Sequence, residues 1–246
     1  MGTFEPRIVA FLDVLGFKDL IDRAARDDNA TPIIEALEKA LTYVGADNKP
    51  SGDFQGQTKM FSDSVIMSGS PTLAGLNWVF WRCIVTQAMF VEYGLLLRGA
   101  ITQGKHYQSE QLVFSEGVVN SYLLEQRVAK YPRVVVEPSI AKLAQQQGRS
   151  FPYPPPDDLI LEDEDGVLFL DYFRYITDGP ASRVDAVRFP ERHREVVEEG
   201  ARRFAKLPHV LEKYRWMAMY HNRKDDEDYI DIIPFIDVEG LFGTKP

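Results

Sequence analysis

The sequence predicts a mixed α/β protein of the α+β kind, and three observations carry this prediction. Short runs rich in β-branched and aromatic residues recur along the chain, as strands require. Longer segments between them repeat apolar residues at helical spacing. Residues suited to turns, such as Gly16 and the pair Ser62–Asp63, separate these segments.

The chain opens with a strand, a turn and a helix. Residues 7–13 (RIVAFLD) form a β-branched and aromatic run that meets Gly16, which suits a buried strand ending in a turn. Apolar residues then follow helical spacing over residues 17–25 and 32–44. We therefore expect a strand–turn–helix unit at the start of the chain.

A β-hairpin is expected next, because residues 54–68 hold two strand-like halves that flank Ser62–Asp63. The first six elements then follow the split βαβ, ferredoxin-like order. The elements predicted after the hairpin are a helix over residues 73–92, a strand over 95–104, a helix over 116–131 and a strand over 133–137.

A change of composition predicts a boundary. Residues 145–158 (QQQGRSFPYPPPDD) are rich in Gln, Pro and acidic residues, as a rigid connector is. Beyond it, short strand-like pieces occupy residues 159–176, and two helical patterns occupy residues 190–220. We expect a core over residues 1–148, with a C-terminal α/β extension over residues 149–246 packed on it.

The composition argues against several classes of function. The chain has 28 Lys and Arg against 37 Asp and Glu, a formal net charge of -9, which disfavours a general binder of polyanions. Its one cysteine, Cys83, permits no internal disulfide and no cysteine-based metal cluster. The first residues lack the pattern of a signal peptide, and polar residues interrupt the longest apolar stretch, residues 73–93. We therefore expect a cytoplasmic protein whose apolar stretch is a buried helix.

Histidines and aromatic residues near the C-terminus are expected to serve packing. No spacing typical of zinc ligands relates the four histidines, which are His106, His193, His209 and His221. Helical spacing relates three packing residues, which are Trp216, Met219 and Tyr220.

Two carboxylates are the first candidates for chemistry. Asp13 ends the first predicted strand, and Asp63 lies at the turn of the hairpin. In a ferredoxin-like sheet these strands are neighbours, so the two side chains can converge on one point. Such oxygen ligands favour Mg²⁺ or Mn²⁺, and two ions about 3.5–4 Å apart would activate a ribose hydroxyl and stabilise a leaving pyrophosphate. The alternative is structural, with Asp13 as a helix cap and Asp63 as a turn residue.

Five motifs, taken in order, resemble the catalytic domain of class III nucleotidyl cyclases. They are FLDVLGF, FSDSVIMS, LLRGAITQG, VFSEGVVNSYLLE and YPRVVVE, and they span residues 7–140. Within that class the chain is most similar to the bacterial pyrimidine cyclases of the Pycsar anti-phage systems. The resemblance implies a head-to-tail homodimer with composite active sites, two Mn²⁺ or Mg²⁺ ions per site, and conversion of a nucleoside triphosphate to a 3′,5′-cyclic monophosphate.

The resemblance also assigns roles to the end of the first strand. Asp13 and Asp63 match the two metal-binding aspartates, and Val14 matches the position whose backbone carbonyl often joins them. Backbone N–H groups before a helix can face a triphosphate. The turn that matches this function in the family is made by Leu15, Gly16 and Phe17.

Base recognition departs from the purine pattern. Purine cyclases place a Lys six residues before the second aspartate, where this chain has Gln57, with Lys59 on the same face by strand parity. The change suits a smaller pyrimidine, and we expect UTP, with CTP as the alternative. Equally, Gln57 and Lys59 could be solvated residues of a strand edge.

The purine enzymes stabilise the transition state with an Asn and an Arg four residues apart, and this chain lacks that pair. Counted from Gly117, the two positions hold Ser121 and Glu125. Asn120 lies one residue away and is the amide we expect to act in its place.

Among the arginines, Arg133 is the expected substitute, because a guanidinium meets the developing charge of a phosphate well. It follows a proline at the start of a predicted strand. Arg127 is expected to be a solvated helix residue, and Arg98 a strand residue that pairs with a carboxylate rather than touching substrate.

We therefore expect a uridylate cyclase that makes cyclic UMP and pyrophosphate, and whose product acts on a separate effector. A cytidylate cyclase is the alternative within the class, and the missing Asn and Arg motivate a second one, a nucleotide-binding cyclase homologue without turnover. A relative of diguanylate cyclases or polymerase palm domains is a third, although the hairpin lacks a GGDEF-like signature. No nucleic acid or membrane partner is expected.

Overall fold

The structure, a computed structural model, describes residues 3–27, 29–45, 55–146, 154–179, 183–224 and 233–243. It divides into two compact units, Met1–Arg174 and Tyr175–Pro246. The sequence predicts a boundary at residue 148, but two short strands within residues 160–170 join the sheet of the first unit. The division therefore falls at residue 174.

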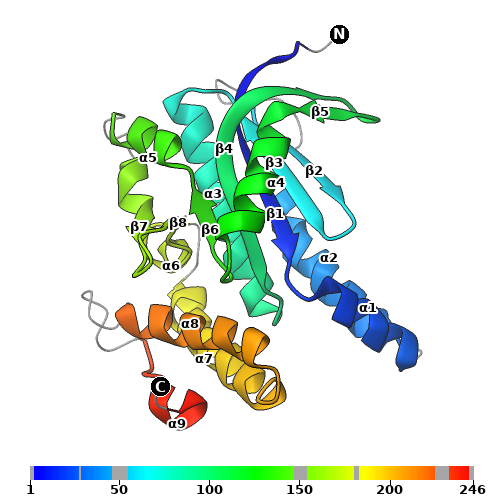
Figure 1. The fold of residues 1–246 in the computed structure, drawn as a ribbon, viewed down its shortest axis with the longest axis vertical. Coiled ribbons are helices and arrows are strands. Elements are labelled where there is room, and N and C mark those ends of the chain that lie inside the picture. The colour runs from blue at the N-terminus through cyan, green and yellow to red at the C-terminus, as the bar shows by residue number, and fades with distance from the viewer. Residues whose placement is uncertain are drawn as a thin grey trace. The chain divides into compact units, whose positions relative to one another are not determined.

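Over the described residues, the first unit is built on an eight-stranded sheet with the order β2-β3-β1-β4-β6-β8-β7, in which β5 pairs with β4 (Figure 1). Neighbouring strands are antiparallel except β4 and β6, which are parallel. The order β2-β3-β1-β4 confirms the predicted α+β, ferredoxin-like arrangement. The strands are Glu5–Val14 (β1), Gln57–Phe61 (β2), Ser64–Gly69 (β3), Leu97–Gln108 (β4), Val113–Ser115 (β5), Val134–Val136 (β6), Ile160–Glu162 (β7) and Leu168–Leu170 (β8).

β1 lies inside the sheet because its residues are apolar on both faces. Ile8, Val9 and Leu12 have no exposed surface. The strand pairs with β3 as far as Asp13, which lies opposite Ser64, and with β4 along its whole length. Side chains alternate between the faces, so Asp13 shares a face with Val9, and Leu12 lies on the other.

Helices cover both faces of this sheet (Figure 1). α3 packs against β1 and β3 with α2 outside it, whereas α4 packs against β1 and β4 on the opposite face. Both α3 and α4 begin at a hydroxyl cap: Thr72 Oγ1 accepts from the N–H of Gly75, and Ser115 Oγ accepts from the N–H of Val118. The helices described here are Phe17–Arg26 (α1), Thr31–Gly45 (α2), Leu73–Glu92 (α3), Glu116–Val128 (α4), Pro138–Gln145 (α5), a 3-10 helix Pro156–Leu159, and Arg174–Thr177 (α6), which begins at the division.

Glycines let α4 lie directly on the sheet. A Cβ atom at Gly104 would be 2.5 Å from the backbone nitrogen of Gly117, and a Cβ atom at Gly117 would be 2.6 Å from the side chain of Val9. Ser121 Oγ reaches the carbonyl of Val9 at 3.0 Å. At Gly104 the backbone of the helix therefore contacts the backbone of the strand directly.

The sequence pattern does not predict β5 or α5. β5 has three residues, too few to show alternation, and it exists because it pairs with the far end of β4. α5 starts at Pro138, a residue favoured at the first position of a helix, and buries Ile140 and Ala144.

α3 is largely buried, as the interrupted apolar stretch predicts. In the part of the chain that the structure describes, no helix combines the length and the apolar character needed to cross a lipid bilayer.

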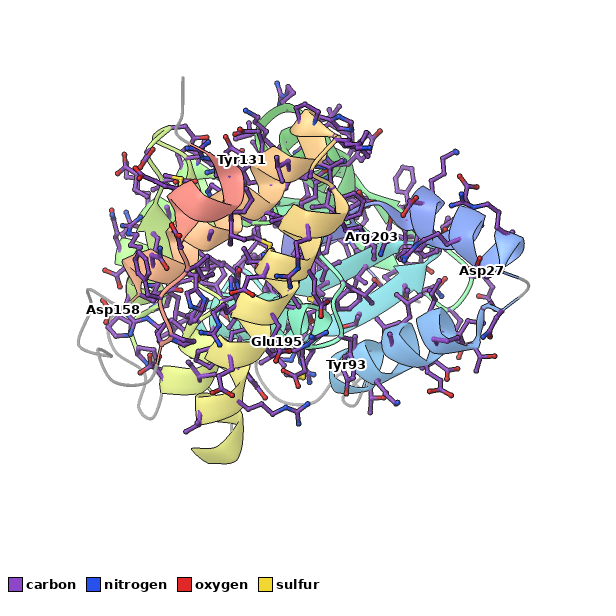
Figure 2. The ribbon with its side chains drawn as sticks, turned by 90° about the horizontal axis from the view of Figure 1, so that it is seen from below. Asp27, Tyr93, Tyr131, Asp158, Glu195 and Arg203 are labelled. Atoms are coloured by element: carbon purple, nitrogen blue, oxygen red, sulfur yellow. The ribbon has the colours of Figure 1, made fainter. Side chains whose placement is uncertain are left out.

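The second unit contains two long helices, α7 (Arg183–Arg203) and α8 (Pro208–Arg223), and a short one, α9 (Val238–Phe242), that packs against both. Figure 2 labels Glu195 and Arg203, which lie on α7, the latter at its last residue. The sequence places the start of this helix at Pro190, but the helix begins earlier and encloses that proline.

Candidate active site

Asp13 and Asp63 lie at the same edge of the sheet, at the ends of neighbouring strands. Asp13 is opposite Ser64 in the pairing of β1 with β3, and the N–H of Val14 donates to the carbonyl of Asp63 at 3.0 Å. The turn between β2 and β3, where Ser62 has a φ of 55°, thus brings Asp63 beside the end of β1. Both aspartates are half-buried.

The turn after β1 holds a glycine because its backbone requires one. Gly16 has a φ of 74°, and a Cβ atom there would meet no neighbour, so conformation and not space selects glycine. The N–H of Leu15 is bound to the carbonyl of Leu96 at 2.8 Å, and the carbonyl of Gly16 accepts from Leu20 at 3.1 Å. Phe17 then begins α1, whose first-turn N–H groups lack partners within the helix, as in every α-helix.

Arg98 connects Asp13 to a buried carboxylate on α4. It is the cross-strand partner of Asp13 on β4, and its Nη2 lies 3.5 Å from Asp13 Oδ2. Its Nε lies 2.5 Å from Oε1 of Glu125, whose side chain has no exposed surface, whereas Arg98 and Asp13 are 23% and 21% exposed. Burial raises the pKa of Glu125 above its ordinary value, and the charge of Arg98 opposes that shift. The expected pairing of Arg98 with a carboxylate is confirmed.

The two positions that hold Asn and Arg in purine cyclases face the sheet in this chain. Ser121 Oγ lies 2.8 Å from the carbonyl of Gly117 and 3.0 Å from Thr102 Oγ1, and like Glu125 it is fully buried. Asn120, one residue round the helix, is exposed on the outer face of α4. Asn120 therefore faces outward and not toward Arg98 and Glu125.

Arg133 is engaged elsewhere, which corrects the role expected for it. Its backbone carbonyl accepts from the N–H of Gly99, so it lies just before β6 and beside the start of β4. Its side chain is fully buried, forms ion pairs with Asp163 and Asp165, and lies over the ring of Tyr131 at 5.2 Å. A guanidinium enclosed by two carboxylates of its own chain leaves no face for a phosphate.

Gln57 and Lys59 lie on β2, and the strand pairing places both on the face that carries Asp13. Both are half-buried, so neither is a fully solvated residue of the strand edge. Lys59 Nζ donates to the carbonyl of Glu110, in the connection between β4 and β5.

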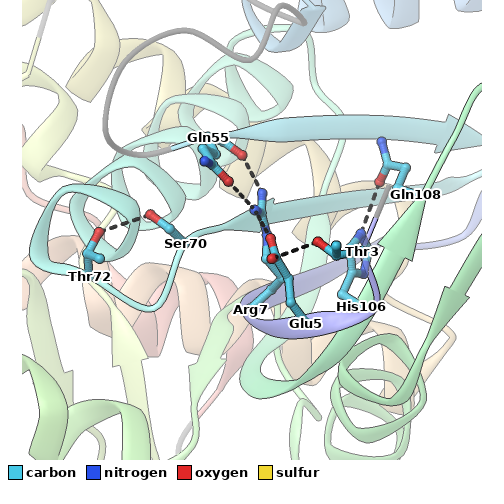
Figure 3. A network of polar contacts seen from close by, with 8 residues as sticks. All are labelled: Thr3, Glu5, Arg7, Gln55, Ser70, Thr72, His106 and Gln108. Atoms are coloured by element: carbon cyan, nitrogen blue, oxygen red, sulfur yellow. Dashed lines mark hydrogen bonds and ion pairs between the residues drawn. The ribbon is translucent and has the colours of Figure 1, made fainter. Parts of the chain in front are cut away.

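Polar contacts hold the far end of β4 and the start of β2, and Figure 3 shows those of His106 with Gln108 and of Arg7 with Gln55. Nε2 of His106 lies 3.3 Å from Oε1 of Gln108, and Nε2 of Gln108 donates to the carbonyl of Thr58 at 3.4 Å. Arg7 donates to Oε1 of Gln55 at 3.2 Å, just before β2. Burial lowers the pKa of His106, which keeps the ring neutral in this network. The edge strand that carries Gln57 is thereby held in place.

The donors at this edge of the sheet suit a hard divalent cation. Asp13 and Asp63 offer carboxylate oxygens with partial solvent access, which Mg²⁺ and Mn²⁺ prefer. Among the residues that the structure describes, no group of three or more His, Cys, Asp and Glu is placed to hold a metal ion. An ion held by two carboxylates would have further coordination positions for water and for a phosphate ligand.

The anchoring of Arg98 by Glu125 was not predicted, although the sequence holds a signal for it. Gly117, Ser121 and Glu125 are four residues apart and so share one face of a helix. If the glycine is there to meet the sheet, the other two residues face the sheet as well.

No family model matches this chain, and no curated protein matches it by sequence. Solved structures resemble it in fold, and three of them are described here. The guanylyl cyclase Cya2 is 13% identical, with a TM-score of 0.43 over 68% of this chain and 91% of that one. A class III adenylyl cyclase-like ATP-binding protein from Pseudomonas aeruginosa is 11% identical, with a TM-score of 0.45 over 72% and 40%. A bacterial light-regulated adenylyl cyclase is 11% identical, with a TM-score of 0.41 over 78% and 57%.

Proposed function

We propose that this protein is a pyrimidine nucleotide cyclase that converts UTP to 3′,5′-cyclic UMP and pyrophosphate. The observation that supports the proposal most is the position of Asp13 and Asp63 at the ends of neighbouring strands. The glycine turn that begins α1 follows Asp13 directly, so a metal-bound triphosphate would find backbone donors beside its ligands.

Asp13 and Asp63 would hold two divalent ions, Mg²⁺ or Mn²⁺, with the backbone carbonyl of Val14. Such ions, when bound, increase the acidity of the ribose 3′ hydroxyl and neutralise charge on the leaving pyrophosphate. The protein contributes position: both carboxylates come from strand ends fixed by backbone hydrogen bonds. The triphosphate would lie against the backbone of Leu15, Gly16 and Phe17.

Arg98 is the cation proposed to meet the phosphate charge in place of Arg133. It lies beside Asp13 and keeps part of its guanidinium exposed, while Glu125 fixes it from below. A charge held in position before the reaction needs no reorganisation when negative charge builds on the phosphate.

Gln57 is proposed to read the base, with Lys59 beside it. The amide of Gln57 offers one acceptor and two donors, which matches the alternating donor and acceptor edge of uracil. The same amide can rotate to match cytosine, so cyclic CMP from CTP is the alternative product.

A second copy of this chain is the proposed partner. The outer face of α4 exposes three apolar side chains, Val119, Tyr122 and Leu123, next to Asn120. Exposed apolar clusters of this kind mark interaction surfaces. Asn120 would then act in the site of the other copy, in a homodimer with composite sites. The product would act on a separate effector in cytoplasmic defence against phage.

One observation favours a second candidate, a nucleotide-binding homologue without turnover. The position that carries the catalytic Arg in purine cyclases holds a buried glutamate, Glu125, and Arg133 is bound within its own chain. Under this alternative, Arg98 and the turn bind a triphosphate and no bond is broken.

Incubation of the full chain with each of the four nucleoside triphosphates and Mn²⁺ or Mg²⁺ tests the proposal, with cyclic products and pyrophosphate measured together. We expect cyclic UMP as the main product and its loss in Asp63→Asn. Asp22→Asn, at an exposed acid of α1, is the matched control and should keep full activity.

Three results would contradict parts of the proposal. Cyclic AMP or cyclic GMP as the sole product would exclude a pyrimidine cyclase. Binding of a non-hydrolysable UTP analogue without any cyclic product would favour the homologue without turnover. Neither binding nor product from any triphosphate would reject both candidates.

A further inference from the structure

Two histidines that the proposed reaction does not use meet inside the second unit. His193 on α7 and His221 on α8 are both fully buried, and their Nδ1 atoms are 3.0 Å apart. Their ring centroids are 5.0 Å apart, and Phe189 and Tyr220 pack on His193. Sequence spacing gives no sign of this pair, because it joins two helices.

The hydrogen bonds fix which ring nitrogens carry protons. His221 Nε2 lies 2.8 Å from the carbonyl of Pro234, and since a carbonyl only accepts, Nε2 carries the proton. In the neutral ring, Nδ1 of His221 is then an acceptor. His193 must therefore donate to it from Nδ1. The pair is a directed chain from His193 through His221 to Pro234.

This series of hydrogen bonds ends at Pro234, in the segment that contains α9. We call residues 233–243 the C-terminal segment. Asn222, next to His221, holds the same segment with two hydrogen bonds: its Nδ2 donates to the carbonyl of Ile236 at 2.8 Å, and its Oδ1 accepts from the N–H of Ile236 at 3.0 Å. Ile233 and Ile236 are buried. The segment is thus fixed to α8 at two adjacent side chains.

The surroundings of the pair disfavour a proton on either ring. Arg194 on α7 adds positive charge near His221, and Lys224 follows α8. The Asp237 carboxylate caps α9 by accepting from the N–H of Gly240, and Glu239 on α9 is exposed. Burial lowers the pKa of His221 to about 4 and that of His193 well below its ordinary value. A proton on Nδ1 of His221 would also place two N–H donors against each other, because the Nδ1–H of His193 points at the same atom.

We propose that His193 and His221 form a pH-sensitive latch, which holds the C-terminal segment on α8 at neutral pH and releases it when the pair takes up protons. Once open, each histidine returns to an ordinary pKa near 6.5 and binds a proton below that pH. Opening therefore becomes more favourable as the pH falls from about 6.5 toward about 4, by about tenfold per pH unit for each proton taken up. The latch is independent of the reaction proposed for the first unit.

Hydrogen exchange of the full chain, read by mass spectrometry from pH 7.5 to 4.5 and corrected for intrinsic exchange, tests the latch. Peptides that cover residues 233–243 should lose protection by about tenfold to a hundredfold per pH unit below about pH 6.5. Peptides from β1 and β4 should not change. His209→Gln, at an exposed histidine of α8, is the control and should behave as the parent protein.

His221→Gln keeps a donor for the carbonyl of Pro234 and cannot titrate, so it should reduce the pH dependence of this segment to the part that His193 alone contributes. A variant that keeps the parent slope, or a parent protein with no slope, would overturn the latch. If the variant fails to fold, ¹⁵N histidine spectra of the parent protein decide the question. They should show Nδ1–H on His193, Nε2–H on His221, and both rings neutral at pH 6. A proton on either buried ring at pH 6, with residues 233–243 still protected, would also overturn it.

Discussion

Two arginines enter neighbouring strands of one sheet, and each meets two carboxylates, yet their surroundings differ. Arg133 is fully buried, and its partners Asp163 and Asp165 both lie in the turn between β7 and β8. Arg98 is partly exposed, and its partners lie at different depths, Glu125 buried on α4 and Asp13 at the sheet edge. Residue type and sequence position favour Arg133 as the phosphate ligand, but burial favours Arg98.

The difference separates a cluster that stabilises the fold from the cluster that we propose to bind a ligand. A buried guanidinium that is paired with two carboxylates of the β7–β8 turn holds that hairpin to the sheet. In the role that we propose for Arg98, a guanidinium fixed from one side by a buried carboxylate would donate to a ligand on its exposed side. The following substitutions test this distinction, and they are ordered from the largest expected effect to the smallest.

Asp63→Asn should have the largest effect, on catalysis. Metal ions stabilise transition-state charge by several kcal/mol, which corresponds to a loss of cyclase activity of about a thousandfold. Initial rates with UTP and Mn²⁺ measure it. Circular dichroism should show an intact fold, because Asp63 contributes its backbone carbonyl to the hydrogen bond with Val14, and the variant keeps that carbonyl. Near-normal activity would show that Asp63 is not a metal ligand in the proposed active site.

Arg133→Met should have the next largest effect, on stability. The change leaves two carboxylates without their cation, and breaking a buried pair costs about 3 kcal/mol. The midpoint of urea unfolding, followed by the fluorescence of Trp78 and Trp81 in a Trp216→Phe background, measures the loss. Arg127→Met, on the exposed face of α4, is the control. KM for UTP should not change, and a large rise in KM with unchanged stability would restore Arg133 to the active site.

Arg98→Gln should lower kcat by about tenfold to a hundredfold, because a hydrogen bond to a charged group contributes about 1.5–3 kcal/mol. Glu125→Gln removes the anchor and keeps the cation, so its loss of kcat should be smaller. Steady-state kinetics of both variants, with Arg127→Gln as control, measure this order. Equal kcat in all three variants would show that Arg98 does not act on the phosphate.

Asp165→Asn should have the smallest effect, below about 1 kcal/mol, because the Asp165 side chain is nearly half exposed. Its hydrogen bonds from Arg133 lower the pKa of Asp165 below the ordinary 3.8. The pair therefore contributes stability above that pH, and loses it as the pH falls through the lowered value. The difference in unfolding free energy between variant and parent should shrink in acid. A difference that grows in acid would show that the ion pair of Asp165 with Arg133 does not stabilise the fold in this way.

The sequence predicts the sheet of the first unit well because its strands are strongly apolar and its turns carry Gly16 and Asp63. The predicted helix over residues 73–92 has the observed bounds. Register along the chain also predicts that Asp13 and Asp63 share an edge. These features depend on local patterns, which one sequence displays.

Features that depend on contacts between distant elements were harder to predict. Arg133 is thirty residues or more from the carboxylates that bury it, and no local pattern announces such a pair. The boundary at residue 148 followed a change of composition, whereas the strands beyond the proline-rich stretch complete the same sheet. His193 and His221 meet only because α7 and α8 pack together.

The contact of Gly104 with Gly117 has a consequence for signalling across the proposed dimer. Since backbone meets backbone there, α4 cannot slide or settle closer when its outer face is pressed. A second chain that binds Val119 and Leu123 would tilt α4 as a rigid body about the contact of Gly104 with Gly117. Glu125 lies two turns along the helix from Gly117, and it is paired with Arg98. A small tilt of the helix would therefore shift the guanidinium of Arg98, so that dimer formation would change the geometry of the proposed active site.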